Sequence, residues 1–292
     1  MRQLDTESFQ YKLRLLIRNR LTLVGFIFLI FIFGLVMFGP LVSPYDPLAI
    51  DFSVKLNPPS FQHFLGTDNY GRDLMSRIFN GARYTLLAAF ISVLIGLALG
   101  APLGVISGFF GKMTDLMLMR TMDILLAFPP LILAMAIVSA IGPSLKSVMI
   151  ALTAVWWPSY ARLIRGDILQ VREEDYIEAA RGLGASSGRV IMRHALPNAI
   201  YPTLIMASLD IGAVVLSAAA LSFLGLGAPE GYADWGQLTS FARNWIVGPL
   251  GDPLRYWYAV TIPGVFILFF VLGWNLLGDA FRDIFDPRLA RR

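Results

Sequence analysis

The chain contains no cysteine and only two histidines among its 292 residues. Without cysteine there is neither a disulfide framework nor a thiolate metal site. The two histidines, His63 and His194, are far apart in the sequence, so we expect no fixed metal site built on them. Charged residues are also scarce, at 15%, and Lys and Arg are scattered over the chain, which argues against a nucleic-acid-binding surface.

What the chain has in abundance is apolar sequence. Apolar residues make up 56% of it, and the mean hydropathy is +0.64, well above the range of soluble domains. Six predominantly apolar stretches are each near the length that a helix needs to cross a bilayer. They cover 21–42, 84–107, 121–141, 148–164, 199–226 and 258–277. We therefore predict an all-α polytopic membrane protein with six transmembrane helices.

The distribution of Lys and Arg predicts how these helices are oriented. If the N-terminus lies inside, the inner segments hold 17 of these residues and the outer segments hold 7. Because positively charged loops tend to stay in the cytosol, both termini are expected there. Residues 1–20 read as a basic amphipathic segment along the membrane surface, followed by a first span that is retained rather than cleaved as a signal peptide.

A polar stretch, 173–202, interrupts the apolar sequence before the fifth span. Tyr176, Ala180 and Leu183 recur at helical spacing, and Gly184 stands where a helix C-terminal cap is expected. Ser186 or Ser187 can cap a second helix, which should end at Pro197. Two short helices with a hinge, placed between two spans, predict a docking element that faces the aqueous phase.

The same stretch resembles a known motif. Glu178-Ala179-Ala180, Gly184 and Leu196-Pro197 follow the spacing EAA-x3-G-x9-I-x-LP, and the only departure is His194 at the Ile position. This pattern is similar to the EAA loop of ABC-importer permeases, which in that family docks into a cleft of the ATPase subunit. The departure affects local packing and not the register, because Leu-Pro follows at the right distance.

Further strings extend the resemblance over essentially the whole chain. The pattern LGTDxxGRDxxSRxxxGxR at 65–83, the string at 233–237 and the segment from Asn275 to Arg288 resemble the C-type permeases of dipeptide, oligopeptide and nickel importers. The resemblance implies an ABC-importer permease (MetI-like) fold, a place in the cytoplasmic (inner) membrane, and a role as a non-catalytic permease subunit. It implies four kinds of partner: a homologous B-type permease subunit, two ATPase subunits, an extracytoplasmic solute-binding protein and membrane lipid. ATP and Mg²⁺ would be bound by the ATPases, with no cofactor on this chain. Peptides are the leading cargo, with nickel chelates or oligosaccharides as alternatives.

We divide the chain into three parts. Residues 1–83 comprise the amphipathic segment, the first span and an outer loop, residues 84–282 form a five-helix core with a coupling loop at about 167–198, and residues 283–292 are a cytosolic tail. Within the outer loop, a short helix is predicted over 71–80, entered from Thr67 or Asp68 and supported by a pair between Asp73 and Arg77.

Small residues and prolines predict the packing of the spans. Glycines at 96, 100, 104 and 108 recur on one face of the second span, where they would let another helix approach closely, unless that face meets lipid. Pro129-Pro130 in the third span and Pro158 in the fourth remove backbone hydrogen bonds. We expect the helices to bend or break there, beside protein or a water-filled cavity.

Asp210 is the one acid deep inside a predicted span, so it is a candidate pathway residue, or else part of a buried pair. Trp156 and Trp157 could line the pathway with it or face lipid, and Asp123, near a cytosolic helix end, should be solvated or paired. Catalytic readings are weak. The phosphate-loop spacing fails around 108–112, and the G-x-S-x-G match at 184–188 lacks the strand that a nucleophile elbow needs. An ATP-independent secondary transporter would need ionisable groups along several spans.

Overall fold

The computed structural model describes residues 20–229, 232–245, 247–249 and 251–285, and this part of the chain contains helices and no extended strand. The long helices are α2 (Arg20–Val42), α3 (Leu74–Phe110), α4 (Lys112–Leu126), α5 (Pro130–Ile141), α6 (Leu145–Val171), α9 (Leu196–Phe223) and α11 (Trp257–Phe285). The short ones are α7 (Asp175–Gly182), α8 (Ser187–Val190) and α10 (Trp235–Ala242), with η1 (Phe52–Val54), η2 (Ile191–Ala195) and η3 (Arg243–Trp245). The predicted amphipathic segment up to residue 19 and the tail beyond residue 285 lie outside the described residues.

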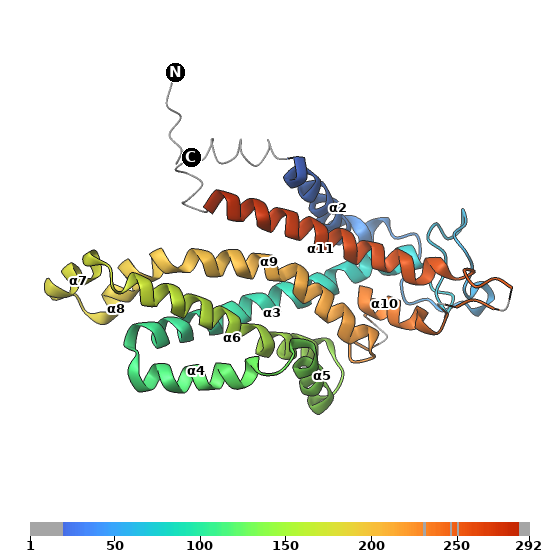
Figure 1. Cartoon of the computed structure of the whole chain (residues 1–292). Coiled ribbons are helices and arrows are strands. Elements are labelled where there is room, and N and C mark those ends of the chain that lie inside the picture. Colours follow the sequence, from blue (N-terminus) through green and yellow to red (C-terminus); the bar gives the residue numbers. More distant parts are fainter. Residues whose placement is uncertain (1–19, 230–231, 246, 250, 286–292) are drawn as a thin grey trace, which may run out of the picture.

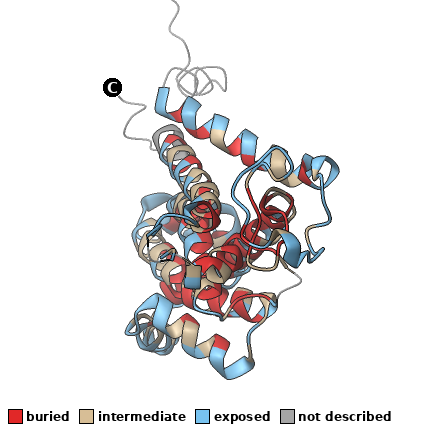
Figure 2. Ribbon diagram, turned by 90° about the vertical axis from the view of Figure 1, so that its right-hand side faces the viewer, coloured by how far each residue is buried: buried red, intermediate tan, exposed pale blue. Residues whose placement is uncertain are grey.

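Helices α3, α6 and α9 form the centre of the molecule. Most of the buried residues belong to these three helices (Figure 2). Helices α2 and α11 lie together on one side of the centre, and α4 and α5 lie on the opposite side (Figure 1). The α7–α8 hairpin stands at one end of the long axis, and α10 with the loop before α3 stands at the other. The two polar segments that the sequence singled out are therefore at opposite ends.

Four helical stretches of the described chain are long and apolar enough to cross a membrane: Arg20–Val42, Leu74–Phe110, Ser187–Phe223 and Trp257–Ala280. A fifth results if α4 and α5, which meet at 89°, count as one span. Helix α6 is long enough at 27 residues, but Lys146, Arg162 and Arg165 make it less apolar than these. By length and composition, the described part of the chain thus has four or five candidate spans.

The glycine ladder on α3 packs against α6, as predicted. A Cβ atom placed on Gly100 would lie 2.4 Å from the carbonyl oxygen of Trp157, and one on Gly104 would lie 2.2 Å from that of Ala161. At both positions the approaching atom is backbone, which cannot move aside as a side chain can. The absence of side chains on this face of α3 therefore sets the distance between α3 and α6.

The prolines have unequal effects. Between α4 and α5 the chain breaks at Pro129-Pro130, as expected, because neither residue can donate the backbone hydrogen bond that would continue the helix. No break occurs at Pro158, which lies buried inside the continuous helix α6. The close packing of α6 along α3 keeps the helix continuous there. A proline removes only one backbone hydrogen bond, and the adjacent turns keep theirs.

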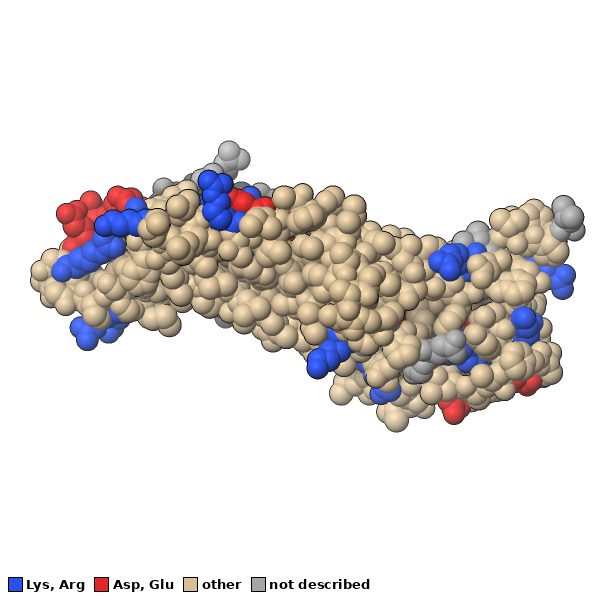
Figure 3. Space-filling model, turned by 90° about the horizontal axis from the view of Figure 1, so that it is seen from below, with Lys and Arg blue, Asp and Glu red and all other residues tan. Residues whose placement is uncertain are grey.

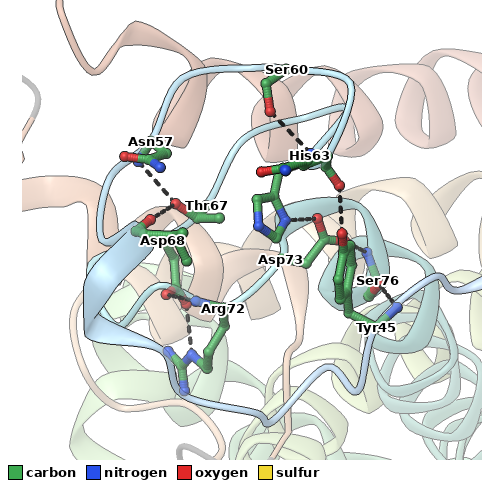
Figure 4. A network of polar contacts seen from close by, with 11 residues as sticks. Tyr45, Asn57, Ser60, His63, Thr67, Asp68, Arg72, Asp73 and Ser76 are labelled. Atoms are coloured by element: carbon green, nitrogen blue, oxygen red, sulfur yellow. Dashed lines mark hydrogen bonds and ion pairs between the residues drawn. The ribbon is translucent and has the colours of Figure 1, made fainter.

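The helix predicted over 71–80 is not separate. It is the first part of α3. Nothing in the sequence around Gly81 interrupts the backbone hydrogen bonds where the polar segment passes into the apolar one. The expected pair between Asp73 and Arg77 is replaced by other contacts, and the helix cap also differs from the expected one. Asp73, and not Thr67 or Asp68, caps the helix by accepting from the backbone N–H of Ser76 at 2.8 Å. Its second carboxylate oxygen contacts Nδ1 of His63 at 3.0 Å (Figure 4).

Asp68 is instead the centre of a buried ion pair. Its carboxylate accepts from Nε of Arg72 at 2.7 Å and lies 3.4 Å from Nε of Arg77. The Arg72 guanidinium also lies over the rings of Tyr70 and Phe241, at 4.6 and 5.1 Å from their centroids. Because Phe241 belongs to α10, this contact joins the loop before α3 to α10.

The strings at 65–83 and 233–237 are packed against each other, although about 150 residues separate them. A Cβ atom on Gly81 would lie 1.8 Å from the carbonyl oxygen of Ala233. The buried Trp235 donates from its ring to the carbonyl of Ile78 at 3.0 Å and from its backbone to Thr85 at 3.1 Å. We call residues 43–73 and α10 together the loop cap. It closes one end of the helix bundle.

Asp234 in this cap gives a testable pH dependence. Burial raises the pKa of its carboxyl from 3.8 to about 6, although Gln237 N–H, at 3.1 Å, favours the charged form. The folded protein then binds a proton more strongly than the unfolded chain. The contribution of Asp234 to stability should therefore fall as the pH rises from about 4 to about 6, by an amount on the order of 3 kcal/mol, and stay constant above that range.

The variant Asp234→Asn keeps the N-cap acceptor and removes the charge. Its thermal unfolding in detergent should not show this loss between pH 4 and 7, so it should gain on the wild type as the pH rises. Asp252→Asn, at an exposed acid of the same end of the molecule, is the control and should follow the wild type. Parallel pH curves for wild type and Asp234→Asn would contradict the assignment.

Candidate functional site

The α7–α8 hairpin turns at Gly184, as the sequence predicted. Gly184 has a φ of +82°, in the left-handed region that side-chain-bearing residues rarely adopt. The N–H of Ala185 donates to the carbonyl of Ala180 at 3.1 Å, and that of Gly184 donates to the carbonyl of Arg181 at 2.9 Å. These are the two hydrogen bonds of a Schellman cap, and they end α7 and reverse the chain.

The hairpin is anchored on the ends of α3 and α6. Ile177 of α7 and Val190 of α8 are completely buried in an apolar cluster. The other members of the cluster are Ala101, Val105, Phe109, Ile164, Ile168, Ala195 and Ala199. Arg181 lies over the Phe109 ring at 5.0 Å, and Arg172 donates to the carbonyl of Gly108 at 3.0 Å. A displacement of the hairpin must therefore move the ends of both central helices.

The opposite face of the hairpin is exposed and carries most of the motif. Glu178, Ala179, Gly184 and Pro197 are exposed, whereas Ala180, His194 and Leu196 are half-buried. Ala180 and Leu196 pack against the apolar cluster. Two large apolar side chains also stand out of this face, because Leu183 is 90% exposed and Met192 is 67% exposed. Exposed apolar residues between charged ones mark a surface suited to another protein.

Pro197 does not end the second helix, contrary to the prediction. Residues 187–223 run on as one helical stretch, with the wide turn η2 just before the proline. In η2 the N–H of Leu196 donates to the carbonyl of Ile191, five residues back. Pro197 is the second residue of α9 and has no N–H to donate to the turn before it. The extra residue in the wide turn is what lets the helix pass the proline.

Ion pairs that the sequence did not suggest hold α4 to α6. Arg165 donates to both carboxylate oxygens of Asp115, at 2.5 and 2.7 Å, and Ser107 at the end of α3 donates to the same carboxylate. Asp123, expected to be solvated or paired, is paired with Arg162 at 2.6 Å. The partners are separated by 50 and 39 residues, so no local pattern could have identified them.

Asp210 lies in the middle of α9 and faces α6. The hydroxyl of Tyr160 and the indole of Trp156 are the polar groups that interact with its carboxyl. Its Oδ2 atom is buried without a close hydrogen-bond partner among the described residues. The backbone of Trp157 packs against Gly96 and Gly100 of α3. The structure thus brings Asp210 and Trp156 together and adds Tyr160, which the sequence analysis did not identify.

The described residues do not form the arrangement that a hydrolase site or a metal site would need. The G-x-S-x-G match lies in the exposed turn between α7 and α8, with no strand before it. Within the described residues there is no group of three or more His, Asp or Glu side chains placed to hold a metal.

Two family models match the chain. The first, described as the binding-protein-dependent transport system inner membrane component, covers residues 100–291. The chain belongs to this family. The second model, the N-terminal transmembrane domain of oligopeptide transport permease C, covers residues 9–59. The resemblance drawn from the EAA pattern and the outer strings is thereby confirmed. The chain is a multi-pass permease subunit of the inner membrane, it is not an enzyme itself, and ATP hydrolysis belongs to separate subunits.

The permease is similar over most of its length to several curated proteins. It is 41% identical to the probable D,D-dipeptide transport system permease protein DdpC of Escherichia coli (strain K12), over 92% of this chain and 88% of that protein. It is 40% identical to the di/tripeptide transport system permease protein DppC of Pseudomonas aeruginosa (strain UCBPP-PA14), over 93% and 89%. Its fold resembles a chain of the inward-facing MetNI methionine ABC transporter, with a TM-score of 0.56 at 22% identity, over 72% of this chain and 97% of that chain. The predicted MetI-like permease fold is confirmed.

Proposed function

We propose that this permease imports peptides, forming half of a translocation pathway whose other half is a homologous B-type permease subunit. Two cytosolic ATPases would bind the hairpins of the two permeases, and an extracytoplasmic binding protein would deliver the cargo. The relatives named for dipeptide and di/tripeptide transport support peptides over nickel chelates or oligosaccharides. The residues proposed to couple to ATPase are Glu178, Ala179, Ala180, Gly184, His194, Leu196 and Pro197.

The orientation follows from this proposal. The α7–α8 hairpin, with its basic residues, would lie in the cytosol together with both termini, and the loop cap would face outward. Six spans result when α4–α5 is one broken span and α6 is another, at the cost of placing the charged residues Arg162 and Arg165 within the inner part of that last span. The division at residues 83 and 282 would then separate a peripheral first span from the five-helix core.

One observation carries the coupling role. The hairpin is rigidly anchored on one face, through Ile177 and Val190, and exposes Leu183 and Met192 on the other. A surface of this kind transmits a displacement from a docked protein to the central helices, because packed cores shift as units. ATP-driven closure of the ATPases would act on α3 and α6 by this route. Asp210, Trp156 and Tyr160 would lie along the pathway that opens, with Trp157 behind them at the α3 contact.

The test is purification of the permease from its native membranes, with its partners and bound small molecules identified by mass spectrometry. Recovery of two ATPases, a second permease and a binding protein that carries a peptide is the expected result. The rival interpretation is a secondary transporter that works without ATP, and Asp210 is the only acid in the middle of the four unbroken candidate spans of the described chain. Recovery of the chain alone, with uptake intact and no ATPase present, would favour that rival.

A further inference from the structure

Two sides of the bundle differ in chemistry. Beyond Arg20 at its start, the large exposed side chains of α2 are apolar, among them Ile27 at 63%, Ile30 at 64% and Leu41 at 81% exposure. A helix side of this composition is suited to lipid. On the side of α4 and α5, charged residues gather mainly at the two ends, with a broad uncharged surface between them (Figure 3). Several charges of α4 and α6 nevertheless stand away from the helix ends.

Asp123 and Arg162 form the exposed pair among these charges. Their side chains meet at 2.6 Å and are each 47% exposed. Asp123 is eleven residues into α4 and Arg162 is nine residues before the end of α6. Measured along the helix axes, the pair therefore lies about 14–16 Å from the start of α4 and from the end of α6. Arg120, one turn earlier on α4, is exposed as well. Ionised groups at such a depth face water or protein rather than hydrocarbon.

The break between α4 and α5 lies next to this pair. Residues 127–130 are exposed, and the chain turns by 89° there. Pro130 has no N–H to donate to the carbonyl of Leu126, so that carbonyl needs a partner outside the regular helix ladder. Irregular backbone at membrane depth is tolerated where it lines a water-filled cavity or is covered by protein. This second observation, independent of the charges, points to the same side of the molecule.

We propose that this surface, made of Arg120, Asp123, Ile124, Phe128 and Arg162 and called here the α4–α6 face, lines the water-filled pathway of the permease. We further assign the Asp123–Arg162 pair as a contact for the charged ends of the cargo. A peptide with free termini carries an ammonium group, which a carboxylate accepts, and a carboxylate, which a guanidinium binds well. The assignment rests on the proposed function, since it takes peptide as the cargo.

The absence of cysteine makes the first part directly testable. Ile124 on the α4–α6 face and Ile30 on α2 are both 64% exposed, so Ile124→Cys and Ile30→Cys differ in surroundings and not in exposure. The assembled complex, in proteoliposomes with the reagent on both sides, is treated with a charged thiosulfonate, and the mass shift of this chain is followed. The ionised thiol, which forms only in contact with water, attacks the reagent sulfur, forms a mixed disulfide and releases a sulfinate, so Ile124→Cys should react roughly tenfold faster or more. Equal rates at the two positions, fast or slow, would overturn the proposal.

The second part is tested by neutralising the pair. Asp123→Asn with Arg162→Gln keeps polar, hydrogen-bonding side chains at both positions but removes both charges. Uptake of a dipeptide with free termini at limiting concentration should fall roughly tenfold, while loaded binding protein still stimulates the ATPases. Unchanged uptake, or a loss only in proportion to a loss of folded complex, would overturn the cargo contact. If instead the wild-type complex consumes no ATP during uptake, the proposed function itself fails, whatever the variants do.

Discussion

Replacing Gly184 by valine is expected to abolish peptide uptake while leaving the permease inserted in the membrane. The residue holds a φ of +82°, a conformation that costs an L-residue about 1–2 kcal/mol and a β-branched one more. A Cβ atom there would meet no atom within 4 Å, so the effect arises from the backbone and not from a clash. Helices α7 and α8 have only 8 and 4 residues, and they depend on the Schellman cap between them for their relative placement. Loss of the cap would leave the ATPase without an ordered surface to bind.

Two further variants separate the backbone effect from the added side chain. Gly184→Asn should retain most of the uptake, because Asn tolerates the left-handed region. Gly182→Val adds the same side chain two residues earlier, also in open space, at a helical position without a positive φ. It should keep more uptake than Gly184→Val. Uptake is measured in proteoliposomes with ATP inside, together with ATPase stimulation and the amount of inserted chain. Normal uptake by Gly184→Val would refute the coupling role of the hairpin.

Features that depend on neighbouring residues were predictable from the sequence. Gly184 as a turn, the glycine ladder of α3 and the break at Pro129-Pro130 all follow from what a single residue can or cannot do with its backbone. The apolar stretches also predicted the long helices. The helix predicted over 71–80, however, proved to be the first part of α3. The family pattern was legible for the same reason, since its spacing lies within about twenty residues of one hairpin.

Features that depend on distant residues were not predictable. Asp73 has Arg77 one turn ahead, yet it caps α3 and contacts His63, while Arg77 turns to Asp68. An i,i+4 pair is worth only about 0.3–0.5 kcal/mol, so tertiary packing overrides it easily. Tyr160 illustrates the same limit, because its place beside Asp210 depends on how α6 and α9 pack, and nothing in its local sequence marks it. The passage of the helix past Pro197 depends on one wide turn that leaves no periodic signal.

Replacing Gly104 by leucine should prevent the permease from forming a stable complex, the largest effect on stability that we expect. Even a Cβ atom at this position would lie 2.2 Å from the carbonyl oxygen of Ala161 and 2.5 Å from Cγ2 of Ile164. Helix α6 would have to move away from α3, and the apolar cluster that holds the α7–α8 hairpin would open with it. We expect the free energy of unfolding to fall by at least about 3 kcal/mol, at the upper end of what overpacking costs.

Gly34→Leu on α2 is the matched control for this change. Gly34 also lies within a candidate span, but a Cβ atom there meets nothing within 4 Å, so the added side chain would face lipid. Both variants add the same apolar side chain, and insertion into the membrane should be unaffected in both. Thermal unfolding in detergent and co-purification of the other subunits should then separate them. Gly34→Leu should behave as the wild type and Gly104→Leu should lose its partners. Equal stability of the two would mean that α3 and α6 are not held together by the close approach at Gly104, and the hairpin would need another route to the core.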